Sequence, residues 1–501
     1  MRVIDKGNYI QYLPQEDGPS VRSLLGFKVS KTEPWVRVEN NFINRFILGL
    51  PYEKVHDSRE LHHCFDLDEY QRVDVDRMCQ GSILNANPMG LGKTVEAIRT
   101  LRELDVRNAL IIVPKIIRKQ WLMQFERWWP EAYKRCKIYD NPKKDTVVDD
   151  GSIYIINYEK LTSDSVLMKF KKWQWDALIV DEAHRIKNRN SKRTLACKSI
   201  PAKRKYPLTG TPITRYVDDL WSILHFIDPY YSGNSYWNFV NYFCVVEETF
   251  WGNKITGLTE DPFKLNVLRT LLSKCCIRNE SVKVTKGRTV EVIKLPLEDS
   301  HRKVYNDIRK IALDELPDTL TIANGAVLTM RLRQLCSWPG HFIDNAPGTK
   351  FQWIEDLLSN TDEKIVVFSC FERSISALVD YLRSKEFRAQ KITGKNDAEE
   401  NETSKQMFLK DPHTRVLAGT FGAMREGYDG LQEVSRIVVM LDRDWSPALM
   451  DQAESRLDRM LQKLPVWVVY LEIENSFDQY VGRINIHKTD DIRRALDDKN
   501  S

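Results

Sequence analysis

The amino-acid sequence predicts an α/β protein with two parallel-sheet lobes, helical insertions and a small N-terminal accessory module. Apolar runs of strand length alternate with amphipathic segments of helix length in two separate stretches, which is the pattern of parallel sheets with crossover helices. The 501 residues are too many for one core, since domains average roughly 150 residues. Apolar residues make up 42% and charged residues 29% of the chain, as is usual for globular proteins.

The accessory module covers residues 1–62. Strand-like segments at 8–13 and 35–39 and several basic residues (Arg22, Lys28, Lys31 and Arg37) suggest a small α/β unit. Such a unit could grip duplex or branched DNA or brace the first lobe, and the sequence agrees with both interpretations.

The first lobe is expected over residues 63–280. Its predicted strands are 81–85, 109–114, 152–157, 177–181 and 205–209. Residues 214–280 form an insertion with helical periodicity, and twelve of the residues from 216 to 251 are Phe, Tyr or Trp. We interpret these aromatic residues as the core of the insertion, because base-stacking platforms need exposed, spaced aromatic rings in a basic groove.

The second lobe, preceded by a linker and a helical insertion, is expected over residues 281–480. Its predicted strands are 364–370, 389–393, 415–420, 436–441 and 466–473, and residues 481–501 form a tail.

Composition excludes several classes of protein. No run of 18 apolar residues is present, so we expect no membrane-spanning helix. Charges at positions 5 and 6 interrupt the hydrophobic segment that a secretory signal would need. The nine cysteines include no C-x-x-C pair, so reduced thiols are expected. These features predict a soluble intracellular protein, of the cytoplasm or nucleoid, or a bacterial or viral protein acting in a host cytoplasm.

One cluster of metal-binding residue types lies near the start of the first lobe. His56, His62, His63 and Cys64 fall within nine positions. They lack the paired spacing of a structural zinc site. We therefore favour a polar linker between domains over a zinc site.

A phosphate-binding loop is predicted at 87–94, with the sequence NPMGLGKT directly before a helix-like segment. Glycines at 90 and 92 let backbone N–H groups face phosphate oxygens, and the following helix N-terminus adds its positive dipole end. Lys93 would neutralise phosphate charge and the Thr94 hydroxyl would ligate Mg²⁺. Asn87 stands where the full phosphate-loop pattern has glycine.

An acidic motif completes the predicted nucleotide site. Residues 178–184 read LIVDEAH, an apolar strand that ends in two carboxylates. A carboxylate at the end of a strand beside a phosphate loop can hold Mg²⁺, and its neighbour can orient the attacking water. Asp181 and Glu182 fit these two roles, so the loop and the motif together predict hydrolysis of a nucleoside triphosphate.

These motifs resemble those of helicase superfamily-two ATPases, and within them the Swi/Snf-type, DEAH-containing group of double-stranded-DNA translocases. The longer acidic motif at 181–188 (DEAHRIKN) and the segment 208–213 (LTGTPI) are the most specific signals. The resemblance covers about 400 residues and implies that both lobes have the RecA-like fold.

The resemblance also implies roles for individual residues. It assigns nucleotide contacts to Gln71, Met89, Gly90, Leu91, Gly92, Lys93 and Thr94, and Mg²⁺ to Thr94 and Asp181. It assigns coupling of hydrolysis to movement to His184, Thr209, Gly210, Thr211 and Gln452. It assigns DNA contacts to Pro114, Lys115, Tyr158, Gly427 and Asp429.

Two arginines of the last motif are expected to complete catalysis. Arg456 and Arg459 lie three apart, which would place both on one face of a helix. Arginine fingers stabilise charge on the transferring phosphoryl group. Since these two would come from the opposite lobe, hydrolysis would require closure of the lobes.

A few positions depart from the family pattern. Asn87 and Pro88 replace an acidic pair, Arg215 replaces the common Asn, and Leu461 replaces the usual Gly. None of them removes a group expected to touch phosphate.

The predicted function is therefore an ATP- and Mg²⁺-dependent motor that moves along duplex DNA and remodels branched or protein-bound DNA. Net charge is only +5, but nine basic residues and no acid lie between residues 183 and 206, which places this run near the DNA path or on a solvated helix face. Backbone contacts would make DNA binding largely independent of sequence. A strand-separating DNA or RNA helicase and a nucleotide-binding scaffold without turnover are the alternatives, and no fused nuclease is predicted.

Overall fold

The computed structural model describes residues 2–14, 24–29, 35–52, 61–140, 148–249, 252–279, 287–314, 322–344, 346–425, 428, 430–459 and 462–496. The chain forms two compact units. The first contains residues 1–282 together with 488–501, and the second contains residues 283–487. None of the described helices combines the length and apolarity needed to cross a bilayer.

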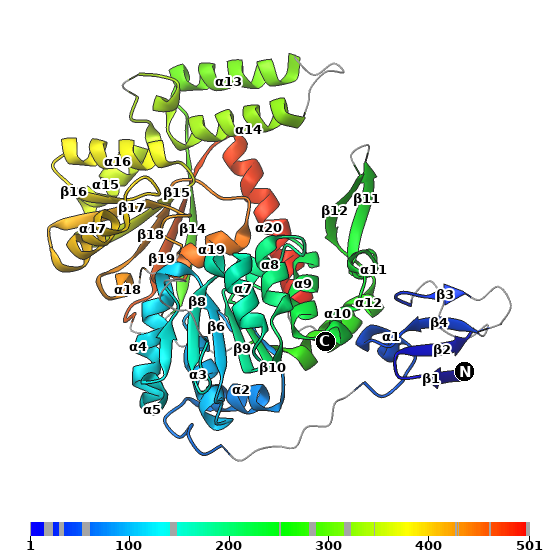
Figure 1. Ribbon diagram of the computed structural model, residues 1–501. Coiled ribbons are helices and arrows are strands. Elements are labelled where there is room, and N and C mark those ends of the chain that lie inside the picture. The colour runs from blue at the N-terminus through cyan, green and yellow to red at the C-terminus, as the bar shows by residue number, and fades with distance from the viewer. Residues whose placement is uncertain are drawn as a thin grey trace. The chain divides into compact units, whose positions relative to one another are not determined.

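The N-terminal module of the first unit is an antiparallel sheet with one helix (Figure 1). Ile10, Tyr12, Val36 and Val38 are buried at alternate positions of its two long strands, so one face of the sheet is apolar. The strands lie in the order β1-β2-β4-β3. Their bounds, with that of the helix, are β1 (Arg2–Asp5), β2 (Tyr9–Leu13), β3 (Lys28–Val29), β4 (Val36–Glu39) and α1 (Phe42–Ile47).

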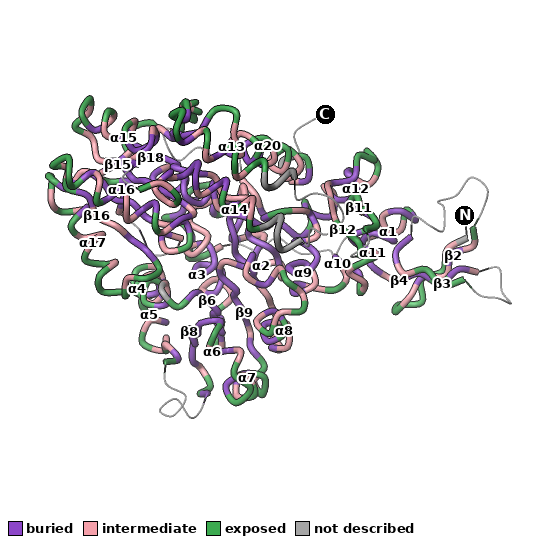
Figure 2. The backbone as a smooth tube through the Cα atoms, turned by 90° about the horizontal axis from the view of Figure 1, so that it is seen from above, coloured by how far each residue is buried: buried purple, intermediate pink, exposed green. Residues whose placement is uncertain are grey.

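The main sheet of the first unit has seven parallel strands in the order β13-β5-β10-β9-β6-β8-β7. Its central strands are buried on both faces (Figure 2), which is why they appear in the sequence as continuous apolar runs. The strand bounds are β5 (Leu84–Asn85), β6 (Ala109–Val113), β7 (Cys136–Ile138), β8 (Ile153–Asn157), β9 (Trp175–Asp181), β10 (Ala202–Leu208) and β13 (Cys276–Ile277).

Helices connect these strands. Each crossover between parallel strands needs a segment that returns the chain to the starting edge, usually a helix. The helices and helical turns are α2 (Glu69–Gln80), α3 (Lys93–Glu103), η2 (Lys115–Ile117), α4 (Arg118–Trp128), α5 (Pro130–Tyr133), α6 (Tyr158–Leu161), α7 (Asp164–Lys171), η3 (Ala183–Ile186) and α8 (Lys192–Ser199).

The aromatic-rich insertion lies between β10 and β13. Phe226, Phe239 and Phe243 are fully buried, so these rings form a core, as the sequence indicated. The insertion also contains an antiparallel hairpin that the sequence analysis did not predict, because both strands are largely exposed and therefore show no apolar run. Its elements are α9 (Asp218–Ile227), α10 (Pro229–Ser232), α11 (Tyr236–Phe243), β11 (Cys244–Thr249), β12 (Gly252–Leu258) and α12 (Pro262–Cys275).

The second unit is built on a six-stranded parallel sheet in the order β14-β19-β18-β15-β17-β16. The two parallel sheets confirm the predicted fold class. The strands are β14 (Arg288–Leu295), β15 (Lys364–Ser369), β16 (Arg388–Ile392), β17 (Thr414–Thr420), β18 (Ser435–Met440) and β19 (Val466–Ile473). The helices are α13 (Asp299–Asp314), α14 (Ile322–Ser337), η4 (Pro339–His341), α15 (Thr349–Asn360), α16 (Glu372–Ser384), α17 (Ala398–Lys410), α18 (Leu431–Val434), α19 (Pro447–Glu454) and α20 (Phe477–Leu496).

Candidate active site

The phosphate loop lies between β5 and the N-terminus of α3. Gly90 and Gly92 have φ angles of 84° and 87°, in the left-handed region that favours glycine. The Lys93 ammonium donates to the carbonyl oxygens of Asn87 (2.8 Å) and Pro88 (3.1 Å), so it lies over the loop. Backbone N–H groups, a helix N-terminus and a lysine thus converge where an anion can bind.

Gln71 packs directly against this loop from α2. Its Nε2 donates to the carbonyl oxygen of Leu91 at 3.2 Å, and the Tyr70 hydroxyl donates to the same oxygen at 3.1 Å. A Cβ on Gly92 would lie 2.4 Å from Gln71 Nε2, so no larger residue fits there without displacing the glutamine. Gln71, one of the residues predicted to contact the nucleotide, therefore lies beside the phosphate loop.

The acidic motif lies at the end of β9, whose last residue is Asp181, two strands away from β5 in the same sheet. Asp181 Oδ2 accepts a hydrogen bond from Trp121 Nε1 at 2.8 Å, and Oδ1 accepts one from the Glu182 backbone N–H at 2.9 Å. Burial, and then the Glu182 carboxylate, raises the pKa of Asp181 to about 7. Glu182 has a φ of 53°, a backbone conformation that side-chain-bearing residues rarely adopt and that occurs preferentially at functional sites.

His184 joins the acidic motif to the segment after β10. Its Nδ1 lies 3.3 Å from Glu182 Oε2 and 3.2 Å from Thr209 Oγ1, and the Thr211 N–H donates to Thr209 Oγ1 at 3.2 Å. A Cβ built on Gly210 would lie 3.0 Å from Met89 Cγ and 3.5 Å from Lys93 Nζ. The fold thus brings the predicted coupling residues of this unit between the acidic motif and the phosphate loop.

Tyr158 has a different environment from the one predicted. Its side chain is fully buried, and its hydroxyl donates to the carbonyl oxygen of Asp181. The guanidinium groups of Arg185 and Arg193 lie 5.8 and 5.4 Å from its ring centroid. A fully buried ring offers no surface to DNA, so Tyr158 supports the end of β9 instead.

The other residues predicted to contact DNA lie apart from this buried position. Pro114 caps η2, and Lys115, the first residue of η2, is exposed. Gly427 and Asp429 lie outside the described residues.

The segment near residues 62–64 is held by a carboxylate. Glu103 accepts hydrogen bonds from the backbone N–H groups of His62 (2.9 Å) and His63 and from the Cys64 thiol (3.2 Å). Within the described ranges, no group of three or more His, Cys, Asp or Glu residues could hold a metal ion, and His56 lies outside those ranges.

In the second unit, the predicted helix for the two arginines is wrong. Helix α19 ends at Glu454, so Arg456 lies in the turn that follows it and Arg459 lies in a bend. The Arg459 N–H donates to the Leu457 carbonyl oxygen at 3.0 Å, which is not an α-helical bond. Leu457 is fully buried, and turning the chain after Glu454 places it in the core. Gln452, on the last turn of α19, is buried.

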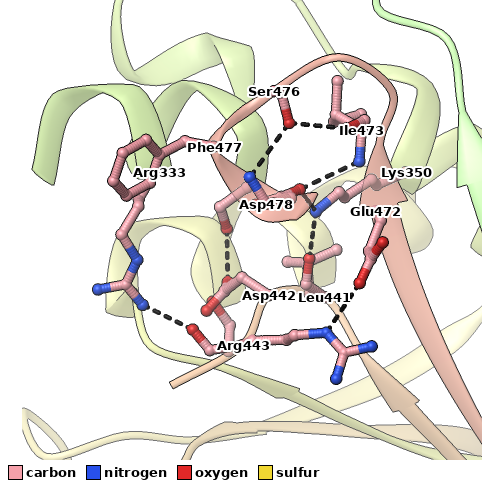
Figure 3. Close-up of polar contacts among 12 residues, drawn as sticks. Arg333, Lys350, Leu441, Asp442, Arg443, Glu472, Ile473, Ser476, Phe477 and Asp478 are labelled. Atoms are coloured by element: carbon pink, nitrogen blue, oxygen red, sulfur yellow. Dashed lines mark hydrogen bonds and ion pairs between the residues drawn. The ribbon is translucent and has the colours of Figure 1, made fainter. Parts of the chain in front are cut away.

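A polar cluster fixes the loop that leads from β18 to α19 (Figure 3). Lys350 is buried, and its ammonium contacts the Leu441 carbonyl oxygen (2.6 Å) and the Asp478 carboxylate (2.7 Å). Arg443 Nε donates to Glu472 Oε1 at 2.9 Å. Charge-assisted hydrogen bonds are stronger than those between neutral groups. These contacts therefore hold the loop in place before α19, the helix that precedes Arg456 and Arg459.

Comparison with known proteins decides the family. The SNF2-related domain matches residues 63–341, more than half of the chain, and the helicase conserved C-terminal domain matches residues 349–460. The chain belongs to the SNF2-related family. This assignment confirms the Swi/Snf-type resemblance of the motifs and places the chain among helicase-type ATPases.

Two curated relatives are similar to this SNF2-related chain over most of its length. A human SWI/SNF-related matrix-associated actin-dependent regulator of chromatin, subfamily A member 1, is 26% identical over 428 residues, covering 79% of this chain and 40% of the relative. An uncharacterized ATP-dependent helicase of Mycoplasma pneumoniae is 26% identical over 527 residues, covering 98% of this chain and 47% of the relative. The chain thus spans less than half the length of either protein.

Solved structures of the family were also found. The Sulfolobus solfataricus SWI2/SNF2 ATPase core in complex with dsDNA aligns with a TM-score of 0.42 and 20% identity, covering 88% of this chain and 99% of that one. The core domain of the same protein gives a TM-score of 0.40, with 89% and 98% covered.

Sequence reasoning missed a set of buried polar residues beneath the phosphate loop of this SNF2-related chain. Asp74 and Glu96 are buried carboxylates on α2 and α3, and Asn85 and Asn87 lie between them. The pattern N-x-N at the end of a buried strand was the available signal, since amides within an apolar run usually have specific partners.

Proposed function

We propose that this chain is an ATP-dependent motor that moves along duplex DNA and remodels branched or protein-bound DNA. The observation that supports it best is the convergence of the Lys93 loop, Asp181–Glu182 and the 209–211 segment at the carboxyl edge of one parallel sheet. Ligands of open α/β sheets bind at this edge. Family membership adds ATP as the nucleotide.

The residues of the first unit have distinct roles in this proposal. Lys93 and the N–H groups of the loop bind the phosphates, and Gln71 presents an amide to the base. Glu182 orients and deprotonates the attacking water, because it adjoins the carboxylate at the strand end. His184 contacts both Glu182 and Thr209. It therefore couples changes at the nucleotide to the segment after β10.

Asp181 and the Thr94 hydroxyl would hold Mg²⁺. Both offer oxygen ligands, which Mg²⁺ prefers. Asp181 is 9% exposed and lies beside the Glu182 carboxylate, so a divalent cation there would offset the repulsion between the two carboxylates. When bound, Mg²⁺ would neutralise part of the negative charge of the phosphates.

Arg456 and Arg459 are proposed as arginine fingers from the second unit. Guanidinium groups cancel charge that develops on the transferring phosphoryl group. Because the two residues belong to the other unit, hydrolysis would require the units to close around the nucleotide, and product release would let them open. Alternation of these states, with Gln452 as a coupling residue, would step the protein along DNA.

DNA binding is proposed through phosphate groups. Pro114 and Lys115 of the first unit, and Gly427 and Asp429 of the second, are the proposed contact positions. Contacts to the backbone position a protein without reading sequence. The basic residues of the 185–205 segment are partly engaged within the first unit, for example Lys203 with Asp176 at 2.7 Å, so at most a part of this run serves DNA.

The test is ATP hydrolysis by the purified protein without nucleic acid and with single-stranded DNA, single-stranded RNA, or duplex DNA of increasing length. Stimulation that grows with duplex length is expected from a motor that keeps moving until it meets an end. Glu182→Gln is the control, because it keeps the size of the side chain and removes the base.

The same measurement separates the alternatives. A preference for single strands would favour a strand-separating DNA or RNA helicase. Nucleotide binding without turnover under every condition would favour a scaffold.

A further inference from the structure

A buried network of amides and carboxylates lies directly beneath the phosphate loop. Asn87 Nδ2 donates to Asp74 Oδ2 at 2.7 Å and also lies 3.3 Å from Glu96 Oε2. Asn85 Nδ2 donates to the same Glu96 oxygen at 2.6 Å. Asn85, Asn87 and Glu96 are all fully buried, so each lost hydrogen bond would leave a polar group without water.

Asn279, which lies 192 positions after Asn87 in the sequence, completes this network. Its Nδ2 donates to Asp74 Oδ2 at 2.6 Å and to Asn87 Oδ1 at 3.1 Å, and its backbone N–H donates to Asn87 Oδ1 at 3.0 Å. The Asn87 side chain thus contacts three residues outside its own segment: Asp74, Glu96 and Asn279. Its own backbone carbonyl accepts the Lys93 ammonium at 2.8 Å.

Asn279 lies close to the point at which the chain leaves the first unit. It follows β13, which pairs with β5 just before the loop, and the Ala86 N–H donates to the Ile277 carbonyl oxygen at 2.8 Å. The first of the two segments that form this unit ends at Val282, three residues after Asn279. Among the described residues, Asn279 is the one nearest to this exit that contacts the phosphate loop, so a displacement of the chain there would act on this contact.

We infer that Asn279 is a positioning residue of the nucleotide site, which ties Asn87 and the phosphate loop to the point where the chain leaves the first unit. The inference rests on the proposed binding of ATP at Lys93. When Lys93 binds phosphate, its three N–H donors are shared between the phosphate and the loop carbonyls, which weakens its contact to the Asn87 carbonyl. The side-chain bonds to Asn279 and Asp74 then hold Asn87 in place, and a shift of the exit segment would change the loop.

Asn279→Ala tests this role, with Asn108→Ala as the matched control. Asn108 lies in the same unit and also makes two side-chain hydrogen bonds, to Asp150 and from the Gly151 N–H, both at 2.8 Å. Asn108 directly precedes β6, so it lies at the amino ends of the strands, whereas the phosphate loop lies at their carboxyl ends. We expect Asn279→Ala to raise the Kd of a non-hydrolysable ATP analogue about fivefold, the effect of roughly one net hydrogen bond, and Asn108→Ala to leave it unchanged.

A double-mutant cycle with Asn87→Ala separates positioning from general loss of stability. If Asn279 acts through Asn87, the double variant should bind the analogue no more weakly than Asn87→Ala alone. Hydrogen exchange of the segment Cys276–Asn279 gives a second readout. The analogue should change this exchange in the wild-type chain and not in Asn87→Ala.

Three results would overturn the inference while the wild-type chain still binds ATP: equal effects of Asn279→Ala and Asn108→Ala, additive effects of Asn87→Ala and Asn279→Ala, or an exchange response that survives in Asn87→Ala. A wild-type chain that binds no nucleotide would overturn the proposed function, and this inference with it.

Discussion

Arg459 is the residue whose removal should separate nucleotide binding from hydrolysis. We expect Arg459→Ala to bind ATP almost normally and to lose nearly all turnover, because an arginine finger acts on charge that exists only in the transition state and is worth on the order of 10³-fold or more. Lys93→Ala should impair both, since lysine contacts the phosphates in the bound state as well. Nucleotide titration beside steady-state hydrolysis checks both variants. Weak binding with normal turnover per bound Arg459→Ala enzyme would contradict the finger assignment.

Tyr158 offers a test of its buried position. Tyr158→Phe removes the hydrogen bond to the Asp181 carbonyl oxygen and should cost about 1–3 kcal/mol of stability, because a buried acceptor loses its donor. Turnover should fall since Asp181 is less well held, while affinity for duplex DNA should stay within twofold. Thermal unfolding, hydrolysis and DNA titration measure the three quantities. A large loss of DNA affinity with unchanged stability would support the prediction from the sequence that Tyr158 contacts DNA.

The environment of Lys198 predicts that the stability of the fold depends on pH. Burial, followed by the cations Lys205 and Arg189, lowers its pKa to about 8, and its ammonium lies 4.8 Å from the Trp221 ring centroid. No ion pair of Lys198 occurs among the described residues. Because its folded pKa lies below the unfolded value, the charged lysine opposes folding most strongly below pH 8, and this cost disappears as the pH rises toward about 10.

Lys198→Met should therefore unfold at a higher temperature than the wild type at pH 7, and the difference should shrink toward pH 10. Lys203→Met is the control, because Lys203 pairs with Asp176 at 2.7 Å and its removal should bring no gain. An advantage of Lys198→Met that stays constant from pH 7 to pH 10 would show that charge is not its cause.

At the scale of elements, strand β14 holds the end of α19. Arg288 contacts Asp451 (2.8 Å) and Glu454 (3.2 Å), and the Tyr470 hydroxyl donates to Glu454. Burial raises the pKa of Glu454, and Arg288 opposes this shift. Arg288→Ala would leave a buried carboxylate without its cation and should destabilise the second unit by about 3 kcal/mol.

Adding Glu454→Gln to Arg288→Ala should recover part of that loss, because a neutral amide tolerates burial better than an unpaired carboxylate. Denaturant unfolding of the single and double variants measures the recovery. A double variant no more stable than Arg288→Ala would show that the buried charge is not the cause.

The elements that the sequence predicted correctly are those with a strong local signal. Strands β6, β8, β15 and β19 are buried on both faces and appear as apolar runs, so their predicted bounds lie within one residue of those observed. Strand β14 was missed, because its eight residues are mostly exposed at the edge of the sheet. The segment forms a strand because it pairs with β19, and its own sequence shows no apolar run.

The candidate site divides in the same way. The loop and the acidic motif are short contiguous patterns, and the sequence was sufficient to find them. The contacts between Trp121 and Asp181, and between Asn87 and Asn279, join residues 60 and 192 positions apart. Only the order of strands in the sheet brings such residues together, and a single sequence does not encode that order as a local pattern.

At the scale of the whole molecule, the first unit contains both ends of the chain. Helix α20 begins in the second unit, and its residues from Lys488 onward belong to the first. Ala495 is fully buried in the core that contains Leu268 and Phe243, and Ile492 and Leu496 pack against it. The Arg494 carbonyl oxygen accepts a hydrogen bond from Arg269 at 3.3 Å.

Removing residues 488–501 should therefore lower the unfolding temperature of the first unit, although the nucleotide residues remain. Ala495→Asp should act in the same direction, since it buries a charge in an apolar core. Ile486→Ala is the control, because that side chain is 60% exposed. Unfolding of the first unit at the wild-type temperature in both the truncated chain and Ala495→Asp would contradict this role of α20.

The discontinuity of the first unit also bears on how the protein is made. Its phosphate loop and acidic motif leave the ribosome before residue 190, but Ile492, Ala495 and Leu496 emerge only after the whole second unit. Until then, the apolar surface around Leu265 and Leu268 of α12 lacks part of its cover and is open to association with other chains. The first unit must wait for the whole second unit to be synthesised, so residues 488–496 set the moment at which its core can close.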